Sequence, residues 1–357
     1  MQVIYPSRES FYRTLQESET GSSDFIVVVT GAFLPLNMDE MKSIMEECTR
    51  VLREGGLLFV QGTYDYLSEL GVFLDSRMDF KYWIAVESTE RSVPGSLPSV
   101  HAGILIFSKG NGRLNVRKVR FPWEKCVHCH KSLRDWGGKT HLMHPDGCVV
   151  SDVWKELPML NNYTQISGPV LETILKLPDF TPPRRLAKNY IPWPLRGIVG
   201  PKEAVEQGKS VSHIEFERPP VTEQYSGAIN ELSDDLTNVI HLGDALDVLK
   251  RYPDNCIDLA FADPPYNLNK TYNSCNDGWE DKDYLEWCDA WLDEYVRILK
   301  PTGSLYLHSD PTMSHYLEII MDSIFGAETF RNEVIWKRTT ATAITGRAAS
   351  TWAVSMT

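Results

Sequence analysis

Residues 258–266 read Asp-Leu-Ala-Phe-Ala-Asp-Pro-Pro-Tyr, an apolar segment that runs directly into a turn with two prolines. The pattern has a counterpart near the N-terminus, where residues 24–33 read Asp-Phe-Ile-Val-Val-Val-Thr-Gly-Ala-Phe. A short apolar run bounded by turn residues indicates a buried β-strand. The two segments therefore predict two equivalent strands in distant parts of the chain.

Each predicted strand is followed by further matching segments. Residues 48–60 and residues 295–307 both contain the end of a helix, a stop at Gly or Pro and a new apolar strand. A third match joins residues 79–86 with residues 329–336. Three matches in the same order predict an internal duplication, and the alternation of strands and helices predicts an α/β fold with a mostly parallel sheet.

The composition is that of a soluble globular protein, because 42% of the 357 residues are hydrophobic and 24% are charged. This length suffices for two domains with separate cores. The longest apolar stretch, residues 25–36, is interrupted by Thr30, Gly31 and Pro35, and the N-terminus lacks an apolar signal-peptide core. We therefore expect a cytoplasmic protein with no membrane-spanning segment.

The formal net charge of −12 argues against a uniformly basic surface but permits a local basic face. Residues 109–139 contain nine Lys or Arg residues and two acidic residues. This segment is either a nucleic-acid-contacting face or a solvated basic hairpin, and the sequence leaves both interpretations open.

A cysteine–histidine cluster lies between the two copies. Cys126 and Cys129 are separated by two residues and are followed by His141, His144 and Cys148. Tetrahedral structural zinc sites use Cys and His at such spacings, and the first pair is a strong half-site. Five candidates for four positions leave the ligand set open. The alternative is a loop of unrelated thiols and histidines, and a bound zinc ion would either place a nucleic-acid-contacting module or stabilise the fold.

These features predict four parts of the chain. They are a degenerate first copy at residues 1–120, a zinc-binding insert at 121–158, a Pro-rich connector at 159–235 and the second copy at 236–357. The density of prolines in the connector predicts short elements, with no long helix and no central strand. The second copy is expected to open with a strand at residues 238–244 and a helix at residues 245–251.

The turn at residues 263–266 carries the residue types that one reaction needs. It directly follows a strand, and ligands of open α/β sheets bind beyond the carboxyl ends of the strands. An exocyclic aromatic amine is a poor nucleophile because its lone pair is delocalised into the ring. If the Asp263 carboxylate and the Pro264 carbonyl accept its two N–H groups, they favour the geometry for attack on a methyl sulfonium. Pro264 and Pro265 fix the backbone, and Tyr266 offers a ring on which an extruded base stacks. The alternative is a plain Pro-Pro turn.

The sequence around this turn resembles the DNA amino-methyltransferases of the permuted β class. The resemblance extends over residues 238–340 and rests on the turn and on the segments 241–244, 254–258, 298–308 and 325–338. It implies a Rossmann-like methyltransferase sheet, S-adenosylmethionine as methyl donor and DNA as partner. By this resemblance Asp244 and Asp263 border the donor, and Asp263 and Tyr266 hold the target base. An Asp at the first motif position is more usual for adenine N6 than for cytosine N4 enzymes.

Two departures from the family pattern concern the donor site and the first copy. No glycine-rich Phe-x-Gly-x-Gly loop follows Tyr266, and the single Gly-x-Gly at residues 110–112 opens no helix. We therefore expect a truncated or split product, with a homodimer or a partner chain supplying the missing glycine-loop half. In the first copy, residues 30–33 (Thr-Gly-Ala-Phe) replace the acidic motif, so this copy is expected to be catalytically silent and to act as an internal pseudo-partner.

The leading hypothesis is a site-specific DNA adenine-N6 methyltransferase of the restriction–modification type that uses S-adenosylmethionine. One alternative is a non-catalytic DNA-binding or scaffold subunit, which the missing glycine loop and the degenerate first copy favour. A second alternative is an amino-methyltransferase that acts on cytosine N4 or on RNA. Trp279, in the loop after the motif, is a further candidate for contact with an extruded base, whereas the aromatic residues at 284, 287 and 291 have helical spacing and indicate a core face.

Overall fold

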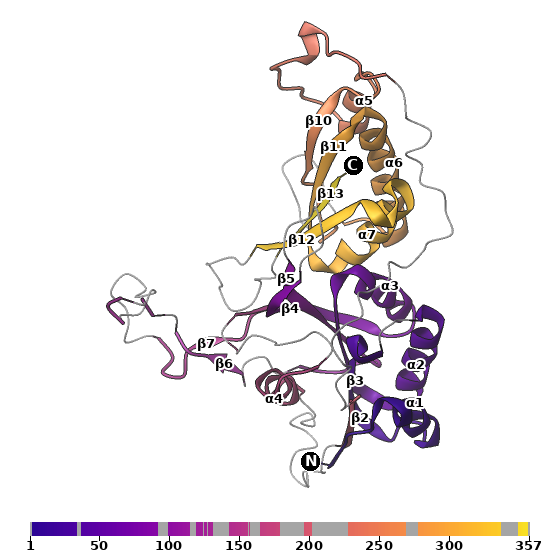
Figure 1. Ribbon diagram of the computed structural model, residues 1–357, viewed down its shortest axis with the longest axis vertical. Coiled ribbons are helices and arrows are strands. Elements are labelled where there is room, and N and C mark those ends of the chain that lie inside the picture. The colour runs from indigo at the N-terminus through magenta and orange to yellow at the C-terminus, as the bar shows by residue number, and fades with distance from the viewer. Residues whose placement is uncertain are drawn as a thin grey trace.

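The computed structural model describes residues 2–33, 37–91, 99–114, 119–123, 125–126, 128–130, 143–155, 157, 165–178, 196–201, 228–268, 278–336 and 349–355. Its α/β elements form two larger sheets and one small one (Figure 1). The strands of the first sheet are β1 (Gln2–Ile4), β2 (Ser23–Val29), β3 (Leu52–Gly62), β4 (Asp79–Arg91), β5 (Ser99–Ser108), β8 (Val153–Trp154) and β9 (Arg196–Gly200). The strands of the second sheet are β10 (Ile257–Ala262), β11 (Leu299–Ser309), β12 (Phe330–Trp336) and β13 (Ala349–Ser355). The small sheet pairs β6 (Arg120–Phe121) with β7 (Cys148–Val149).

Seven α-helices accompany these strands in the described part of the chain. They are α1 (Arg8–Glu17), α2 (Met38–Val51), α3 (Tyr64–Asp75), α4 (Gly168–Lys176), α5 (Ala245–Leu249), α6 (Asp281–Ile298) and α7 (Pro311–Phe325). Short 3-10 turns cover Thr30–Phe33, Asp234–Leu236 and Ala327–Thr329. None of the helices in the described residues combines the length and apolarity that a membrane span requires.

The strand order confirms the duplicated α/β fold. The first sheet has the order β1-β9-β2-β3-β5-β4-β8 and the second has the order β10-β11-β13-β12. In the first copy β2 and β3 are parallel, whereas β5 is antiparallel to both β3 and β4. In the second copy β10 and β11 are parallel, whereas β13 is antiparallel to both β11 and β12. The strand–helix–strand order and the pairing therefore correspond element by element from β2 to β5 and from β10 to β13.

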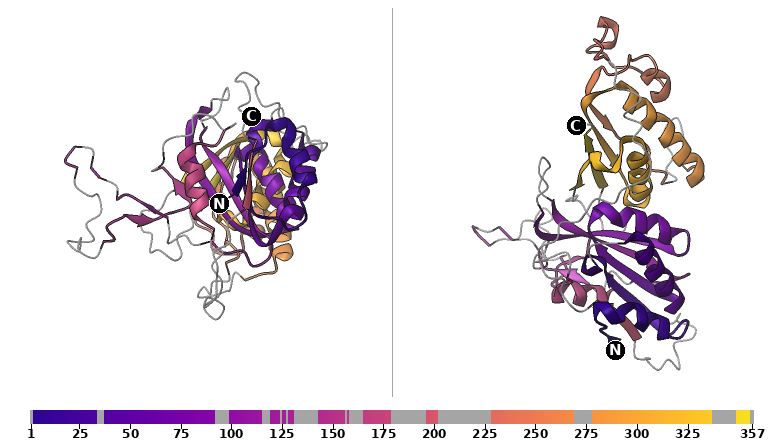
Figure 2. Two further views of the ribbon diagram at one scale, coloured as in Figure 1. Left: turned by 90° about the horizontal axis from the view of Figure 1, so that it is seen from below. Right: turned by 45° about the vertical axis from the view of Figure 1, so that its right-hand side comes forward.

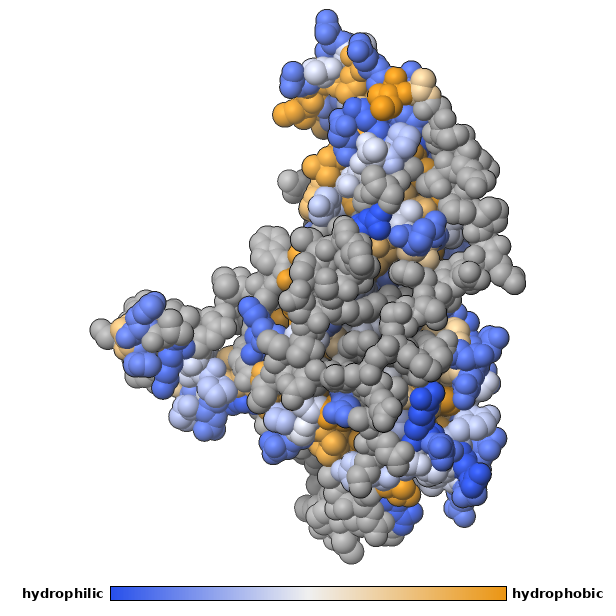
Figure 3. Space-filling model, viewed as in Figure 1, coloured by the Kyte–Doolittle hydropathy of each residue, from blue (hydrophilic) through white to orange (hydrophobic). Residues whose placement is uncertain are grey.

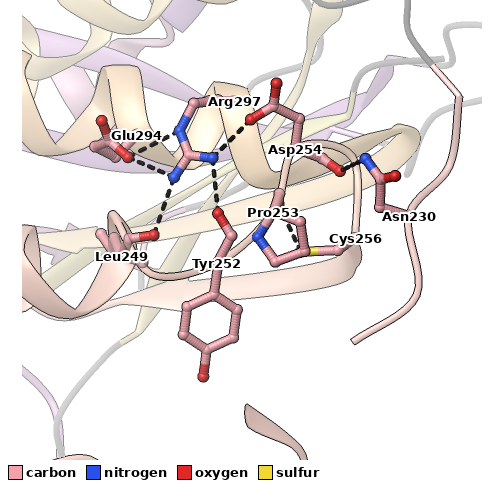
Figure 4. Close-up of polar contacts among 8 residues, drawn as sticks. All are labelled: Asn230, Leu249, Tyr252, Pro253, Asp254, Cys256, Glu294 and Arg297. Carbon is pink, nitrogen blue, oxygen red and sulfur yellow. Dashed lines mark hydrogen bonds and ion pairs between the residues drawn. The ribbon is translucent and has the colours of Figure 1, made fainter. Parts of the chain in front are cut away.

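An arginine in each copy binds the end of the preceding helix in the same way. In the second copy, Arg297 on α6 donates to the carbonyls of Leu249 (3.0 Å) and Tyr252 (2.8 Å), at and just after the end of α5 (Figure 4). It also donates to the carboxylates of Glu294 and Asp254, both at 2.7 Å. The guanidinium thus satisfies carbonyl groups that have no partner within the helix.

Arg50 on α2 makes the corresponding contacts in the first copy. It donates to the carbonyls of Leu15 (2.8 Å) and Ser18 (3.0 Å) at the end of α1, and to the Glu47 carboxylate at 2.8 Å. The duplication therefore includes α1 and α5 and extends to individual polar contacts.

Helices cover both faces of the first sheet (Figures 1 and 2). On one face, alternate residues of β2 such as Ile26 and Val28 pack against α1, α2 and α3. On the other face, Phe25 and Val27 belong to a separate core that includes Val170 of α4. As a result, all seven residues of β2 are buried, as expected for a strand inside an α/β sheet.

The two copies pack together through α3 and α7, which are equivalent helices. Ser68 of α3 donates a hydrogen bond to Glu318 of α7, and Gly71 of α3 lies against the ring of His315 of α7. Ser68 and His315 occupy the same position in their helices, as do Gly71 and Glu318. Each surface therefore contacts its own equivalent, which is the pattern of a two-fold symmetric dimer interface within one chain.

Two expectations from the sequence were wrong. The proline-dense part of the connector, residues 178–235, contains β9, which is a central strand between β1 and β2. The prolines permit this because Pro192, Pro194 and Pro201 flank β9, so the strand keeps its N–H groups. The second error concerns residues 238–244, which are all described and form no strand. The helix that follows is also shorter than predicted, because α5 ends at Leu249.

Candidate active site

Asp263 begins the turn that follows β10, at the carboxyl end of that strand. Its side chain is 57% exposed, whereas that of His308, near the end of the adjacent parallel strand β11, is 9% exposed. Asp263 Oδ1 accepts a hydrogen bond from the Tyr266 hydroxyl at 2.7 Å and lies 2.9 Å from His308 Nδ1. The same His308 nitrogen lies 2.7 Å from the Tyr266 hydroxyl oxygen. Two neighbouring strands therefore bring a tyrosine hydroxyl and a histidine nitrogen to one oxygen of the Asp263 carboxylate.

The prolines of the turn are held from α6. The buried Tyr284 near the start of this helix donates its hydroxyl to the carbonyl of Pro265 at 2.7 Å. Asn267 donates to the Asp281 carboxylate at 2.9 Å and accepts from the backbone N–H of Trp279 at 2.8 Å. These contacts fix the turn between the end of β10 and the start of α6.

Trp279 lies beside this turn, where the sequence placed a candidate base contact. Its ring packs edge-on against Tyr284 at 6.4 Å and Trp287 at 5.2 Å between centroids. It remains 43% exposed. An aromatic face is therefore available to solvent next to the Asp-Pro-Pro-Tyr turn.

The equivalent place in the first copy carries no acidic group. β2 pairs Val28 with Val60 as β10 pairs Ala262 with Leu307, so the next residues, Val29 and Gln61, stand where Asp263 and His308 stand in the second copy. Thr30, which follows Val29, is fully buried and hydrogen-bonded to the Gln61 carbonyl at 2.7 Å. The first copy therefore lacks both members of the Asp–His pair.

Asp244 serves as the N-terminal cap of α5. Its Oδ1 accepts hydrogen bonds from the backbone N–H groups of Leu246 (2.9 Å) and Asp247 (3.4 Å). It therefore stands at a helix N-terminus and not at the end of a strand, and it is exposed. Among the described residues its Oδ2 accepts no hydrogen bond, and its predicted role near a donor remains a prediction.

The cysteine–histidine cluster lies on the segment between β6 and β7. Backbone N–H groups of Cys129 and His128 lower the pKa of the Cys126 thiol, as in a tight turn that favours a thiolate. Cys148, in β7, directs its Sγ to the carbonyl of Phe121 at 3.6 Å. His141 lies outside the described residues, and within the described part of the chain no three potential ligands are grouped around a metal position.

Two residues of the basic segment have roles within the fold. The Lys109 ammonium donates to the carbonyls of Thr49 (2.7 Å) and Leu52 (2.9 Å) at the end of α2. Arg120 donates to the carbonyl of Gly147 at 2.9 Å. These two cations therefore help to satisfy backbone carbonyl groups, and the segment has fewer free charges than its composition indicates.

Sequence reasoning located the Asp-Pro-Pro-Tyr turn but assigned no role to His308 or Tyr284. His308 appeared only as the last residue of a matching strand, and Tyr284 as part of a core face. The signal for His308 was present, because the carboxyl ends of adjacent parallel strands meet at one edge of a sheet. The hydroxyl of Tyr284 gave no signal, since helical spacing does not reveal which buried Tyr bonds a distant carbonyl.

Comparison with known proteins adds to this geometry. Residues 257–351 match the DNA methylase family of the N6/N4 class. The chain is 43% identical over 136 residues to the type II methyltransferase M.BamHI of Bacillus amyloliquefaciens, covering 38% of this chain and 32% of that protein. It is 32% identical over 98 residues to the DNA adenine methyltransferase YhdJ of Escherichia coli K12, covering 28% of this chain and 32% of that protein. The chain thus spans about a third of the length of these curated relatives.

Among solved structures, the M1.HpyAVI–SAM complex is similar at 12% identity with a TM-score of 0.29, over 50% of this chain and 77% of that chain. The family match includes the Asp-Pro-Pro-Tyr turn, its two neighbouring strands and α6. Residues 257–351 are therefore similar in sequence to the DNA methylases of the N6/N4 class.

Proposed function

We propose that this chain takes part in methyl transfer from S-adenosylmethionine to the N6 amine of adenine in DNA. The observation that carries the proposal is the exposed carboxylate of Asp263, held at one oxygen by Tyr266 and His308 while the other is left for a substrate. The leading Asp of the motif and the similarity to a DNA adenine methyltransferase favour adenine over cytosine. Cytosine N4 is the alternative acceptor.

In the proposed reaction the chain binds and orients the acceptor amine. The donor supplies an electrophilic methyl group on sulfur. The Asp263 carboxylate and the Pro264 carbonyl accept the two amine N–H groups, and the Tyr266 ring packs on the extruded base. When the amine nitrogen bonds to the methyl carbon, the carbon–sulfur bond breaks and the amine proton passes to Asp263.

The chain's fit to the donor is only partial. Asp244, exposed at the start of α5, and Asp263 are the described residues that the family resemblance places near the donor. The glycines that follow Tyr266 at 278, 303, 326 and 346 are isolated from one another in the sequence. The described residues therefore account for more of the proposed amine-binding site than of the proposed donor-binding site.

Tritiated methyl transfer to DNA by the chain together with the complementing segment proposed below, followed by digestion to nucleosides, tests the function. N6-methyladenine is the expected product, and N4-methylcytosine would support the alternative acceptor. Asp263→Ala should reduce transfer at least about 1,000-fold, because the variant loses the group that binds the amine and accepts its proton. Asp258→Asn is the matched control, since this exposed carboxylate lies on the same strand, pairs with Lys300 and should not be needed for transfer. Equal activity of the two variants would contradict the site assignment.

We further propose that a second polypeptide segment completes the donor side by pairing with β10. Leu259 and Phe261 on one face of β10 are 61% and 62% exposed, and among the described residues no strand pairs with its outer edge. Their equivalents in the first copy, Phe25 and Val27, are buried because β9 pairs with β2 and α4 covers that face. Figure 3 shows apolar side chains gathered at the end of the molecule where β10 and α5 lie.

The first copy indicates the shape of the missing segment. There β9 is a parallel strand between β1 and β2, preceded by the helix α4. Residues 238–240 (Asn-Val-Ile) stand before α5 as β1 (Gln-Val-Ile) stands before α1, yet Ile240 is fully exposed. A strand that paired with both β10 and residues 238–240 would cover this apolar surface, which explains why residues 238–244 form no strand alone.

Complementation tests this second proposal. The probe is the part of M.BamHI that lies outside the 136 matched residues, added to the full chain. Calorimetry with S-adenosylmethionine should detect binding only for the mixture. Phe261→Lys should prevent complementation, whereas Val334→Lys, at an exposed position of β12, is the control. Donor binding by the chain alone would contradict the need for a partner segment, and a chain that sediments as a dimer would identify a second copy as the occupant.

For the insert we propose structural zinc bound by four of Cys126, Cys129, His141, His144 and Cys148. The turn that places amide groups around the Cys126 sulfur supports this assignment. Metal analysis after purification without chelator should give about one zinc per chain. A content near zero would reject the site.

A further inference from the structure

His308 is a further polar group beside the Asp-Pro-Pro-Tyr turn, although it is not part of that motif. Its ring is buried at the end of β11, directly beside the turn that follows β10. Its Nδ1 faces two oxygen atoms, Asp263 Oδ1 at 2.9 Å and the Tyr266 hydroxyl at 2.7 Å. Such a short pair of contacts constrains which atoms carry hydrogen.

The geometry favours one position of the ring proton. An ionised carboxylate only accepts hydrogen bonds, and the single hydroxyl proton of Tyr266 is directed to the same Asp263 oxygen. An unprotonated Nδ1 would place its lone pair against the carboxylate oxygen without a hydrogen between them. His308 Nδ1 therefore carries a proton and donates it toward Asp263 Oδ1 and the Tyr266 oxygen.

We propose that His308 is a positioning residue for methyl transfer, an inference that rests on the proposed function. His308 and Tyr266 together donate to Oδ1 and hold the Asp263 carboxylate in one orientation. Oδ2 is then the oxygen directed to the substrate amine. Because the histidine ring is buried, its N–H is held in place before a substrate binds, and a fixed donor orients a carboxylate better than mobile water does.

The first copy, which we expect to be catalytically silent, supports the link proposed between Asp263 and His308. At the two equivalent positions it has Val29 and Gln61, so the acidic residue and its histidine are both absent. Gln61 is fully buried and donates its Nε2 to the carbonyl of Gln165, just before α4. The side chain at this strand end therefore holds the polypeptide backbone in one copy and a carboxylate in the other.

Two variants separate the donated hydrogen bond from the bulk of the ring. His308→Asn keeps an N–H donor close to the position of Nδ1, whereas His308→Leu removes it. In the complemented enzyme we expect His308→Leu to lower kcat about 100-fold, a typical loss for one preorganised donor, with the KM for DNA within about twofold. His308→Asn should recover most of kcat. Gln61→Leu is the matched control in the first copy and should leave kcat unchanged.

A second measurement does not depend on transfer. Ring ¹⁵N labelling of histidine in the full chain should show His308 protonated at Nδ1, and Asp263→Asn should change that signal. An Nε2-protonated ring with a bare Nδ1 overturns the proposal whatever the kinetics show. Wild-type kcat in His308→Leu, or an Asn variant as slow as the Leu variant, also overturns it. Absence of transfer by the complemented wild type counts against the proposed function instead, and the NMR result then shows separately whether the hydrogen bond exists.

Discussion

The strands β2 and β10 are equivalent in sequence and topology but differ in their surroundings. β2 has β9 on one side, β3 on the other and helices over both faces, and all of its residues are buried. β10 pairs only with β11 among the described strands and keeps Leu259 and Phe261 exposed. One strand pattern can therefore be a complete core element or an open edge, depending on the segments that are present to cover it.

The two copies also differ in the residues at their strand ends. The copy whose sheet is fully covered has Val29 and Gln61 at the strand ends, whereas the copy with the open edge has Asp263 and His308. The first copy packs its α3 on the equivalent α7 of the second. The first copy is therefore packed against the copy that carries the proposed site.

The largest expected difference between the copies concerns an acidic residue introduced into each strand. Val27→Asp places a carboxylate in a closed core and should destabilise the protein by about 4 kcal/mol or prevent folding. Phe261→Asp is the equivalent change on the exposed face and should alter stability by about 0.5 kcal/mol or less. Urea denaturation followed by circular dichroism measures both. Equal losses would mean that the face of β10 is covered in solution.

Replacing Arg297 or Arg50 by alanine should lower the stability of the protein by similar amounts. Arg297→Ala and Arg50→Ala each remove the guanidinium hydrogen bonds to two carbonyls at a helix end and to a glutamate. A loss of about 2 kcal/mol is expected for each, and somewhat less for Arg50, whose side chain is 32% exposed against 19% for Arg297. Thermal and urea unfolding provide the measurement. A loss of stability in only one variant would show that the equivalent contacts do not contribute equally to stability in the two copies.

The interface between the copies should respond to pH through Asp322 of α7. Burial, followed by the nearby carboxylates of Glu328 and Glu69, raises the pKa of Asp322 to about 7. The folded state then holds a proton that the unfolded state has already lost, so stability should fall as pH rises from about 4 to about 7 and level off above it. The expected loss between pH 5 and 8 is on the order of 2 kcal/mol.

Asp322→Asn should remove most of this pH dependence. Asp75, the equivalent residue of α3, accepts the Tyr316 hydroxyl at 2.5 Å, and Asp75→Asn is the matched control that should keep the dependence. Urea unfolding at several pH values measures both variants. A stability that rises with pH over this range would contradict the assignment.

The smallest difference is expected from the ion pairs at the start of β2 and β10. Asp24 is bound by Arg53 and by the backbone N–H of Arg196 at 2.7 Å, and its side chain is 11% exposed. Asp258, its equivalent, is 78% exposed and pairs with Lys300 at 2.9 Å. Asp24→Asn should cost about 1 kcal/mol and Asp258→Asn about 0.3 kcal/mol or less. Equal costs in denaturation experiments would indicate that the second pair is as enclosed as the first.

Much of the fold followed from local sequence pattern. Residues 257–262 were predicted as a strand and form β10, and the three matched segments predicted the shared strand order. These predictions succeeded because apolar runs, glycine or proline stops and helix ends are encoded within a few residues. β9 was missed, because prolines that flank a strand resemble prolines that prevent one. Residues 238–244 were predicted as a strand, because an apolar run does not show whether its pairing partner is present.

The sequence by itself determined the residues of the proposed site and the repeat. Asp263, Pro264, Pro265 and Tyr266 are adjacent in the chain, so their residue types and order are readable without coordinates. Only the tertiary structure decided that His308 and Tyr284 support this turn, and that β10 has an open edge where β2 is enclosed. The physical reason is that hydrogen bonds between strand ends and the coverage of a sheet depend on residues distant in sequence. Those contacts form only after the chain has folded.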